Sequence, residues 1–85
     1  MTPENTYLFI TAKHKPEMLK AAGSNLEVAA FTHHLFSQFG HAMRGNIPAL
    51  EWIDHLLTNL EIPEPLLLNC LADMSVEAHC IHAAV

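Results

Sequence analysis

The chain has 85 residues, of which 51% are apolar and 15% are charged, and its formal net charge is −5 at neutral pH. This length predicts one helical domain over residues 1–85. No apolar run reaches the roughly 18 residues that a membrane-spanning helix needs, and no basic and then apolar leader opens the sequence. We therefore expect a soluble cytoplasmic protein without a membrane partner.

The charge is distributed unevenly along the chain. Residues 1–44 hold all four basic residues and three acidic ones, a net +1, whereas residues 45–85 hold six acidic residues and no Lys or Arg, a net −6. Phosphate binding needs clustered cations, so nucleic acid is excluded as an expected partner. The acidic half suits a basic partner surface or serves solubility, and solubility is the favoured interpretation.

The apolar content is high for so small a chain. A protein of 9.4 kDa that folds alone buries only about 63% of its unfolded surface. The large number of apolar side chains therefore predicts a shared surface, either in a homo-oligomer such as a homodimer or in a complex with another protein.

The first predicted element covers residues 2–22. Its opening letters, Thr-Pro-Glu, are typical of a helix start. Tyr7–Thr11 prefers a strand, but a lone strand would need a partner edge, so a helix is favoured and a strand stays open. Because proline disfavours helical geometry in the residue before it, Pro16 predicts a break near residues 14–16 and a short second helix over Pro16–Ala22.

The second element begins at residues 24–27, whose letters S-N-L-E match a capping box with Ser24 as the cap. At about 100° per residue its side chains separate into two arcs, which predicts an amphipathic helix that ends at Gly45. The apolar arc contains Val28, Phe31, Leu35, Phe36, Phe39, Ala42 and Met43. The polar arc contains His33, His34, Ser37, His41 and Arg44.

Two further helices follow, separated by the proline-rich residues 62–65. The third begins near residues 46–48, and its apolar arc contains Ala49, Leu50, Trp52, Ile53, Leu56, Leu57 and Leu60. The fourth runs from about Pro65 to the end of the chain, and its apolar residues repeat by threes and fours in one seam. That seam contains Leu67, Leu71, Met74, Ala78, Ile81 and Val85.

Seven histidines are the one unusual feature of the composition. On a helix, metal ligands converge at a spacing of three or four residues. His79 and His82 have that spacing, but Cys80 points about 100° away from His79, so these three candidates do not form one site. We expect no metal and no cofactor. Whether the histidines bind a metal or respond to pH stays open, because histidine titrates near neutral pH.

No catalytic residues are expected, because the sequence contains no nucleophile elbow, glycine-rich phosphate loop or paired-carboxylate motif. The two cysteines, Cys70 and Cys80, lie about 15 Å apart if they share a helix, which is too far for a disulfide. We expect both to be reduced, buried thiols.

The sequence therefore predicts an all-α protein, a small bundle of four to five short helices that oligomerisation or a partner completes. We expect a protein–protein interaction module, such as a regulator, adaptor, inhibitor or chaperone, that occupies a partner surface. The alternative is a small metal- or ligand-binding helical protein that uses the histidine-rich faces. An apolar seam that continues to the chain end and a tryptophan at the edge of its arc indicate the contact residues. These are Trp52, Leu67, Leu71, Met74, Ile81 and Val85.

Overall fold

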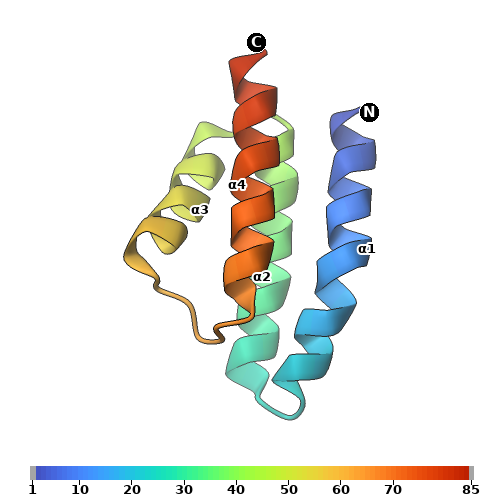
Figure 1. Cartoon of the computed structure of the whole chain (residues 1–85), viewed down its shortest axis with the longest axis vertical. Helices are drawn as coiled ribbons and strands as arrows, with labels where there is room; N and C mark the ends of the chain where they lie inside the picture. The colour runs from blue at the N-terminus through green and yellow to red at the C-terminus, as the bar shows by residue number, and fades with distance from the viewer. Residues whose placement is uncertain (1, 85) are drawn as a thin grey trace.

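The computed structural model describes residues 2–84, which form four α-helices and no β-strand (Figure 1). This confirms the predicted all-α class at the level of a four-helix arrangement. The helices are α1 (Pro3–Ala22), α2 (Leu26–Met43), α3 (Ile47–Asn59) and α4 (Leu67–Ala83).

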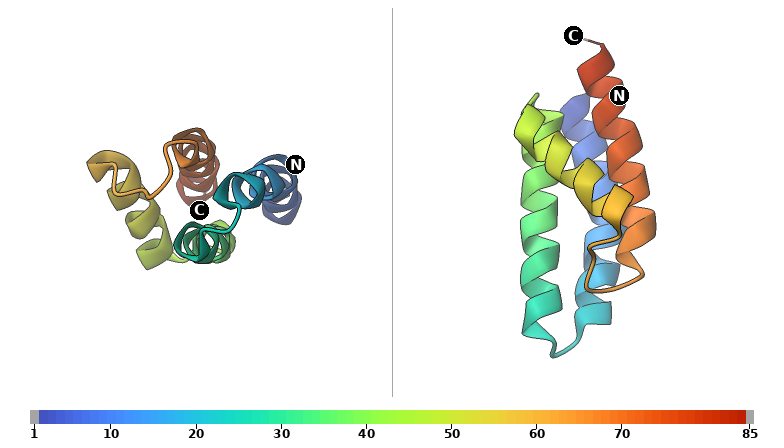
Figure 2. Two further views of the ribbon diagram at one scale, coloured as in Figure 1. Left: turned by 90° about the horizontal axis from the view of Figure 1, so that it is seen from below. Right: turned by 90° about the vertical axis from the view of Figure 1, so that its left-hand side faces the viewer.

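The helices α2 and α4 together occupy the centre of the arrangement. Each of them contacts the other three helices, whereas α1 and α3 contact only α2 and α4. α1 and α2 form a long antiparallel pair, and the shorter α3 is tilted against α2 and α4 (Figures 1 and 2). α4 runs antiparallel to both α1 and α3, so residues far apart in sequence lie at the same level of the bundle.

Tyr7–Thr11 lies inside α1, so the favoured helical interpretation is confirmed. The hydroxyl of Thr2 accepts a hydrogen bond from the backbone N–H of Asn5 at 3.1 Å and caps the helix, with proline in the first turn. The start of the helix thus follows directly from its first three described residues.

The predicted break near residues 14–16 was wrong, because α1 continues through Pro16 to Ala22. Pro16 has no N–H to donate to the carbonyl of Ala12, so the helix loses one hydrogen bond there. Pro16 is exposed, while His14 and Met18 on either side of it are buried against the rest of the bundle. Packing of these neighbours holds the chain in a helix despite the proline.

The caps of α2 differ from the predicted capping box by one residue. Asn25, not Ser24, caps the helix, and its side-chain oxygen accepts from the N–H of Val28 at 3.1 Å. Both residue types cap well, so the local sequence alone did not distinguish them. At the other end Gly45 has a φ of 97° after the last turn, as the sequence predicts.

The core is built around α2, whose predicted apolar arc is confirmed. Six of its seven members are buried and Phe31 is partly buried, while the predicted polar arc is exposed. The largest side chains with under 2% exposure come from α2, α3 and α4. They are Thr32, Leu35, Phe36, Phe39, Ile53, Leu67, Cys70, Leu71 and Met74.

The solvent-accessible surface of the chain is 5089 Å², close to the roughly 5,000 Å² expected of a compact monomer of this mass. The total area therefore does not by itself require a partner. The high apolar content appears instead as eight large apolar side chains that remain exposed. These are Leu8, Phe9, Leu26, Ile47, Leu60, Leu66, Leu68 and Val76.

Replacing Pro16 with alanine should raise the free energy of unfolding by about 1–3 kcal/mol, because the new N–H can donate to the Ala12 carbonyl within a continuous helix. Urea unfolding followed by circular dichroism measures this change. Thr58→Ala, at an exposed helical site, serves as the control and should change stability by less than about 0.5 kcal/mol. An unchanged midpoint for Pro16→Ala would contradict a helix that continues through this residue.

Candidate functional site

Three leucines remain exposed where α3 is joined to α4. Leu60 at the end of α3 is 62% exposed, Leu66 before α4 is 48% exposed and Leu68 in its first turn is 41% exposed. We call these three residues the leucine rim. Loops normally expose small and polar residues, so this concentration of large apolar side chains makes the leucine rim a candidate contact surface.

Polar contacts between α3 and α4 show that two of the rim residues lie at one end of this helix pair. Oδ1 of Asp54 accepts from the hydroxyl of Ser75 at 3.1 Å, and Oδ2 of Asp54 lies 2.8 Å from Nε2 of His79. Leu68 precedes Ser75 by two helical turns and so lies on the same side of α4. Leu60 follows Asp54 in the antiparallel α3, toward the same end of the pair.

Leu60 also has an unusual backbone conformation. Its φ of 53° and ψ of 36° are left-handed, and its N–H donates to the carbonyl of Leu56 to end the helix. Glycine is the usual residue at such a position, and a side chain there costs about 1 kcal/mol. Because the Leu60 side chain is largely exposed, burial within this chain offsets little of that cost.

Two carboxylates, Glu61 and Glu64, lie between Leu60 and Leu66 of the rim in the sequence. Oε2 of Glu61 lies 3.0 Å from Nε2 of His55, and Oε1 of Glu64 accepts from the N–H of Leu66 at 3.4 Å. These contacts hold both carboxylates beside the apolar side chains. Since residues 45–85 contain no Lys or Arg, the rim is an apolar surface with a negative border.

A second set of polar contacts links α4 to α1 and α2. Oδ2 of Asp73 lies 2.7 Å from Nε2 of His14 and 3.4 Å from Nζ of Lys13, and Nε2 of His82 lies 2.9 Å from the carbonyl oxygen of Ala42. The hydrogen bond from His14 is the main cause that holds the pKa of Asp73 below its ordinary value, and Lys13 adds to it.

His14 is a site residue that reasoning from the sequence missed. It is buried, with 8% exposure, and it lies four residues from both Ile10 and Met18 on the buried side of α1. That spacing was a usable signal for burial. Its partner Asp73 is 59 residues away, and nothing in the sequence indicates that pairing.

The candidate metal ligands are directed to different partners. His79 contacts Asp54 on α3, His82 contacts the Ala42 carbonyl on α2, and Cys80 is exposed. Across residues 2–84, no group of three or more His, Cys, Asp or Glu side chains is placed to hold a metal ion. The predicted burial of Cys80 was wrong, because its position on α4 faces outward.

Both cysteines are free thiols, as predicted, and Cys70 is buried. Burial, with a smaller effect from the charge of Asp73, raises the pKa of Cys70 to about 12. The thiolate is the reactive form of a cysteine, and the raised pKa of Cys70 disfavours it there. The exposed Cys80 is therefore the thiol of the two that solvent reagents can reach.

The structure corrects part of the predicted partner-binding set. Leu67, Leu71 and Met74 have 0% exposure and lie in the core of this chain. The seam of α4 is covered because the helix packs against three neighbours rather than one. Ile81 is partly buried, and Val85 lies outside the described residues.

Trp52, the remaining predicted contact residue, is partly buried between α2 and α3. Its ring centroid lies 6.1 Å from that of Phe31 and 5.0 Å from that of His34, the latter in an edge-to-face arrangement. The tryptophan thus stabilises the contact between α2 and α3 and keeps one edge at the surface.

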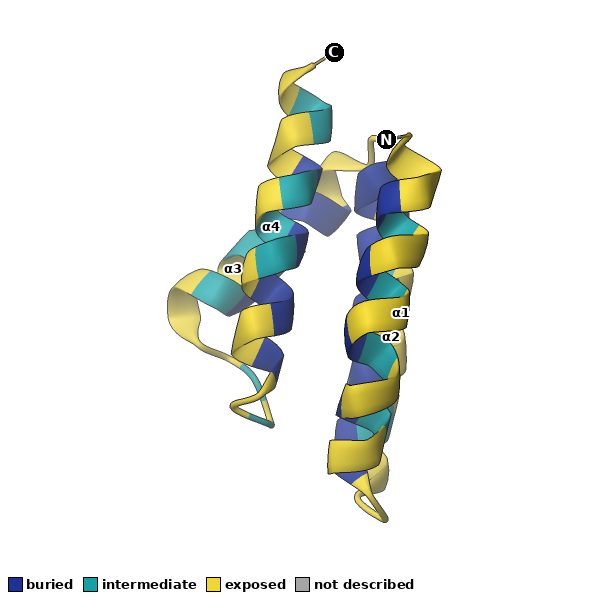
Figure 3. Ribbon diagram, turned by 45° about the vertical axis from the view of Figure 1, so that its right-hand side comes forward, coloured by how far each residue is buried: buried dark blue, intermediate teal, exposed yellow. Residues whose placement is uncertain are grey.

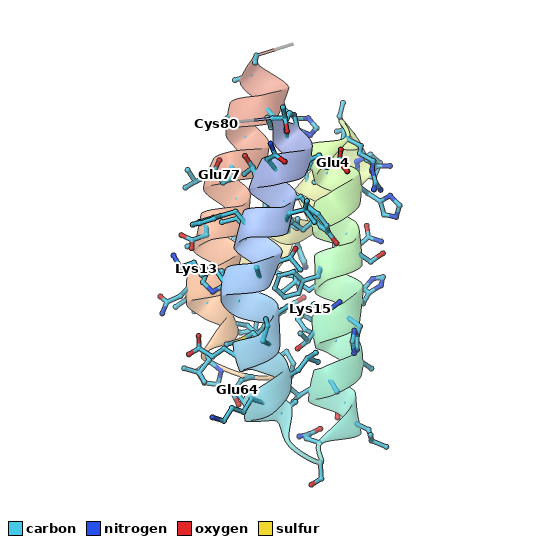
Figure 4. All side chains as sticks on the ribbon, turned by 90° about the vertical axis from the view of Figure 1, so that its right-hand side faces the viewer. Glu4, Lys13, Lys15, Glu64, Glu77 and Cys80 are labelled. Carbon is cyan, nitrogen blue, oxygen red and sulfur yellow. The ribbon has the colours of Figure 1, made fainter. Side chains whose placement is uncertain are left out.

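A hollow of about 460 Å³ lies between the start of α1 and the end of α2. Gly40 borders it, and a Cβ atom there would lie 3.2 Å from Cε1 of Tyr7, so a glycine allows this close approach of α1 and α2. The charged groups in its lining are Glu4 and Arg44; Glu4 is labelled in Figure 4. The lining residues are Thr2, Pro3, Glu4, Tyr7, Gly40, Met43 and Arg44.

None of the helices in the described part of the chain is both long and apolar enough to cross a lipid bilayer. No family model, curated protein or solved structure matches the chain.

The contact between His14 and Asp73 should make stability depend on pH. The pKa of Asp73 is lowered in the folded chain, so the ionised carboxylate adds stability above its ordinary pKa of 3.8, and this stability is lost as the pH falls through the lowered value. Asp73→Asn should lower the free energy of unfolding by about 1 kcal/mol or less, since solvent screens the exposed pair.

Urea unfolding between about pH 5 and about pH 2.5 tests this expectation. The difference between Asp73→Asn and the unmodified chain should shrink toward zero at the acid end of that range. Glu51→Gln, at an exposed position, is the matched control and should show little difference throughout. A constant difference across the range would contradict a role for the Asp73 charge.

Proposed function

We propose that this chain is a small helical protein–protein interaction module that binds a partner rather than catalysing a reaction. One observation carries the proposal: three leucines between 41% and 62% exposed gather at the junction of α3 and α4. Burial of apolar surface is the main favourable term in protein association. The module acts by occupying a partner surface, as a regulator, adaptor, inhibitor or chaperone does.

The charge around the leucine rim supports a basic, amphipathic partner segment. Glu61 and Glu64 border the rim, and the half of the chain that contains it has a net charge of −6. A partner that places apolar side chains against Leu60 and Leu68 and Lys or Arg beside the carboxylates would match both features. Such complementarity favours encounter and orientation, while the leucines supply the apolar contact.

The alternative, binding of a metal or ligand by the histidine-rich faces, has less support. His14, His79 and His82 each contact a carboxylate or a carbonyl on a neighbouring helix. Those contacts link helices of the bundle to one another and leave the imidazoles directed at separate partners.

The double variant Leu60→Ser/Leu66→Ser should lose the partner. Each buried leucine side chain contributes roughly 1.5–3 kcal/mol and every 1.4 kcal/mol is about tenfold in affinity, so binding should weaken at least about tenfold. Affinity capture from the cells of origin, with quantitative mass spectrometry, identifies proteins that the unmodified chain retains and the variant does not. Leu26→Ser is the control, because Leu26 is 82% exposed at the start of α2, a helix that contributes no residue to the rim.

The captured protein is then purified and titrated calorimetrically against the same variants. Its affinity should also fall in Glu61→Gln/Glu64→Gln and at higher salt, since salt screens exposed charges. Recovery of the same proteins with the rim variant and the unmodified chain would contradict the proposal, and so would equal affinities in the purified system.

A further inference from the structure

We infer that a second surface, formed by the outward sides of α1 and α4, binds the same surface of a second copy of this chain across a two-fold axis parallel to the two helices. We call it the α1–α4 face and define it by Phe9, Lys13, Ala72, Asp73 and Val76. It lies on a different pair of helices from the leucine rim, so it does not depend on the partner proposed there.

The α1–α4 face carries two large apolar side chains without cover in this chain. Phe9 is 59% exposed and Val76 is 61% exposed. Figure 3 looks onto this side of the molecule and shows that the outward surfaces of both helices are exposed while their inner edges are buried. Neither residue contributes to the core, so each can change without disturbing it.

The ion pair between α1 and α4 shows which residues of the two helices lie at the same height along the bundle. Nζ of Lys13 lies 3.4 Å from Oδ2 of Asp73, which places these two residues at one height of the antiparallel pair. Phe9 lies one turn before Lys13, and Glu77 lies one turn after Asp73, so both are displaced in the same direction. Phe9 is therefore level with Glu77 and its neighbour Val76, and Figure 4 shows Lys13 and Glu77 along the junction of α1 and α4.

Charge complementarity identifies a second copy as the occupant and selects the direction of the axis. A two-fold axis parallel to the helices places α1 of one copy opposite α4 of the other without changing its height. Lys13 of each copy then faces Asp73 of the other, and four charges of alternating sign surround the axis. An axis perpendicular to the helices at this level would instead place Lys13 against Lys13.

The shapes of the two helices are complementary under the same axis. Phe9 projects from α1, while α4 presents the small side chains of Ala72, Val76 and Cys80, all exposed, on its outward surface. The axis directs Phe9 of one copy onto Val76 and Cys80 of the other. The longest dimension of the chain is 40 Å, which gives the paired helices enough length for the roughly 800 Å² per partner that a stable interface buries.

Analytical ultracentrifugation of the full chain tests the assembly. The unmodified chain should sediment as a dimer at micromolar concentration. Phe9→Ser/Val76→Ser should raise the dimer dissociation constant at least about tenfold, because two apolar contacts are lost per copy. Leu26→Ser, with a more exposed leucine on another helix, should leave the constant unchanged. Circular dichroism checks that each variant keeps its helical content.

Disulfide formation tests the axis. Phe9→Cys/Cys80→Ser is mixed with the unmodified chain labelled with ¹⁵N, so a bond between residue 9 and Cys80 can form only between copies. Oxidation joins the two thiols as a disulfide while the oxidant, such as diamide, takes up two electrons and two protons. A labelled–unlabelled heterodimer linked through residues 9 and 80 is expected, because Cys80 lies within one turn of the level of Phe9. Cys70 is buried with a raised pKa and should not compete.

Three outcomes would contradict this inference, and none of them bears on the leucine-rim proposal. An unmodified chain that stays monomeric at about 100 μM, far above the dissociation constant of a stable dimer, overturns this inference and leaves the leucine rim untouched. A dimer that Phe9→Ser/Val76→Ser does not weaken overturns the assignment of the face. A bond that joins residue 9 of two variant copies, in place of the bond to Cys80, overturns the parallel axis.

Discussion

Packing of α4 against all three other helices is the contact on which the rest of this structure depends. Leu67, Leu71, Met74 and Ala78 along its seam have no exposed surface, and the helix contacts each of the other three, as α2 also does. α1 and α3 do not touch, so α4 and α2 together hold them in place. This seam is covered within the chain and is therefore not available to a partner.

The same packing explains which interaction surfaces remain. The inner side of α4 is buried, and its two flanks carry Asp73 toward α1 and Ser75 and His79 toward α3. Only the outward side, with Val76, and the connection that leads into the helix are left. The two surfaces proposed for contacts with other proteins, the leucine rim and the α1–α4 face, therefore lie outside the buried seam of α4.

Reasoning from the sequence predicted most of the fold and little of the candidate site, for a physical reason. The helical phase of α2 follows from apolar spacing alone, and the cap at Thr2 and the stop at Gly45 follow from local chemistry. The continuity of α1 through Pro16 depends on burial of its neighbours, which local rules do not contain. The pairing of His14 with Asp73 and the exposure of Leu60 depend on how distant helices meet.

The high apolar content of the chain does not come with an unusually large exposed surface. The chain exposes an area that is ordinary for its mass, so its core is not too small for its length. The unusual feature of this surface is its composition. Leucine, phenylalanine and valine occupy exposed positions at which lysine or glutamate would not lower the stability of the fold. Leu60 strengthens this point, since its left-handed backbone would be relieved by glycine. An exposed side chain that folding does not require is best explained by a contact made after folding.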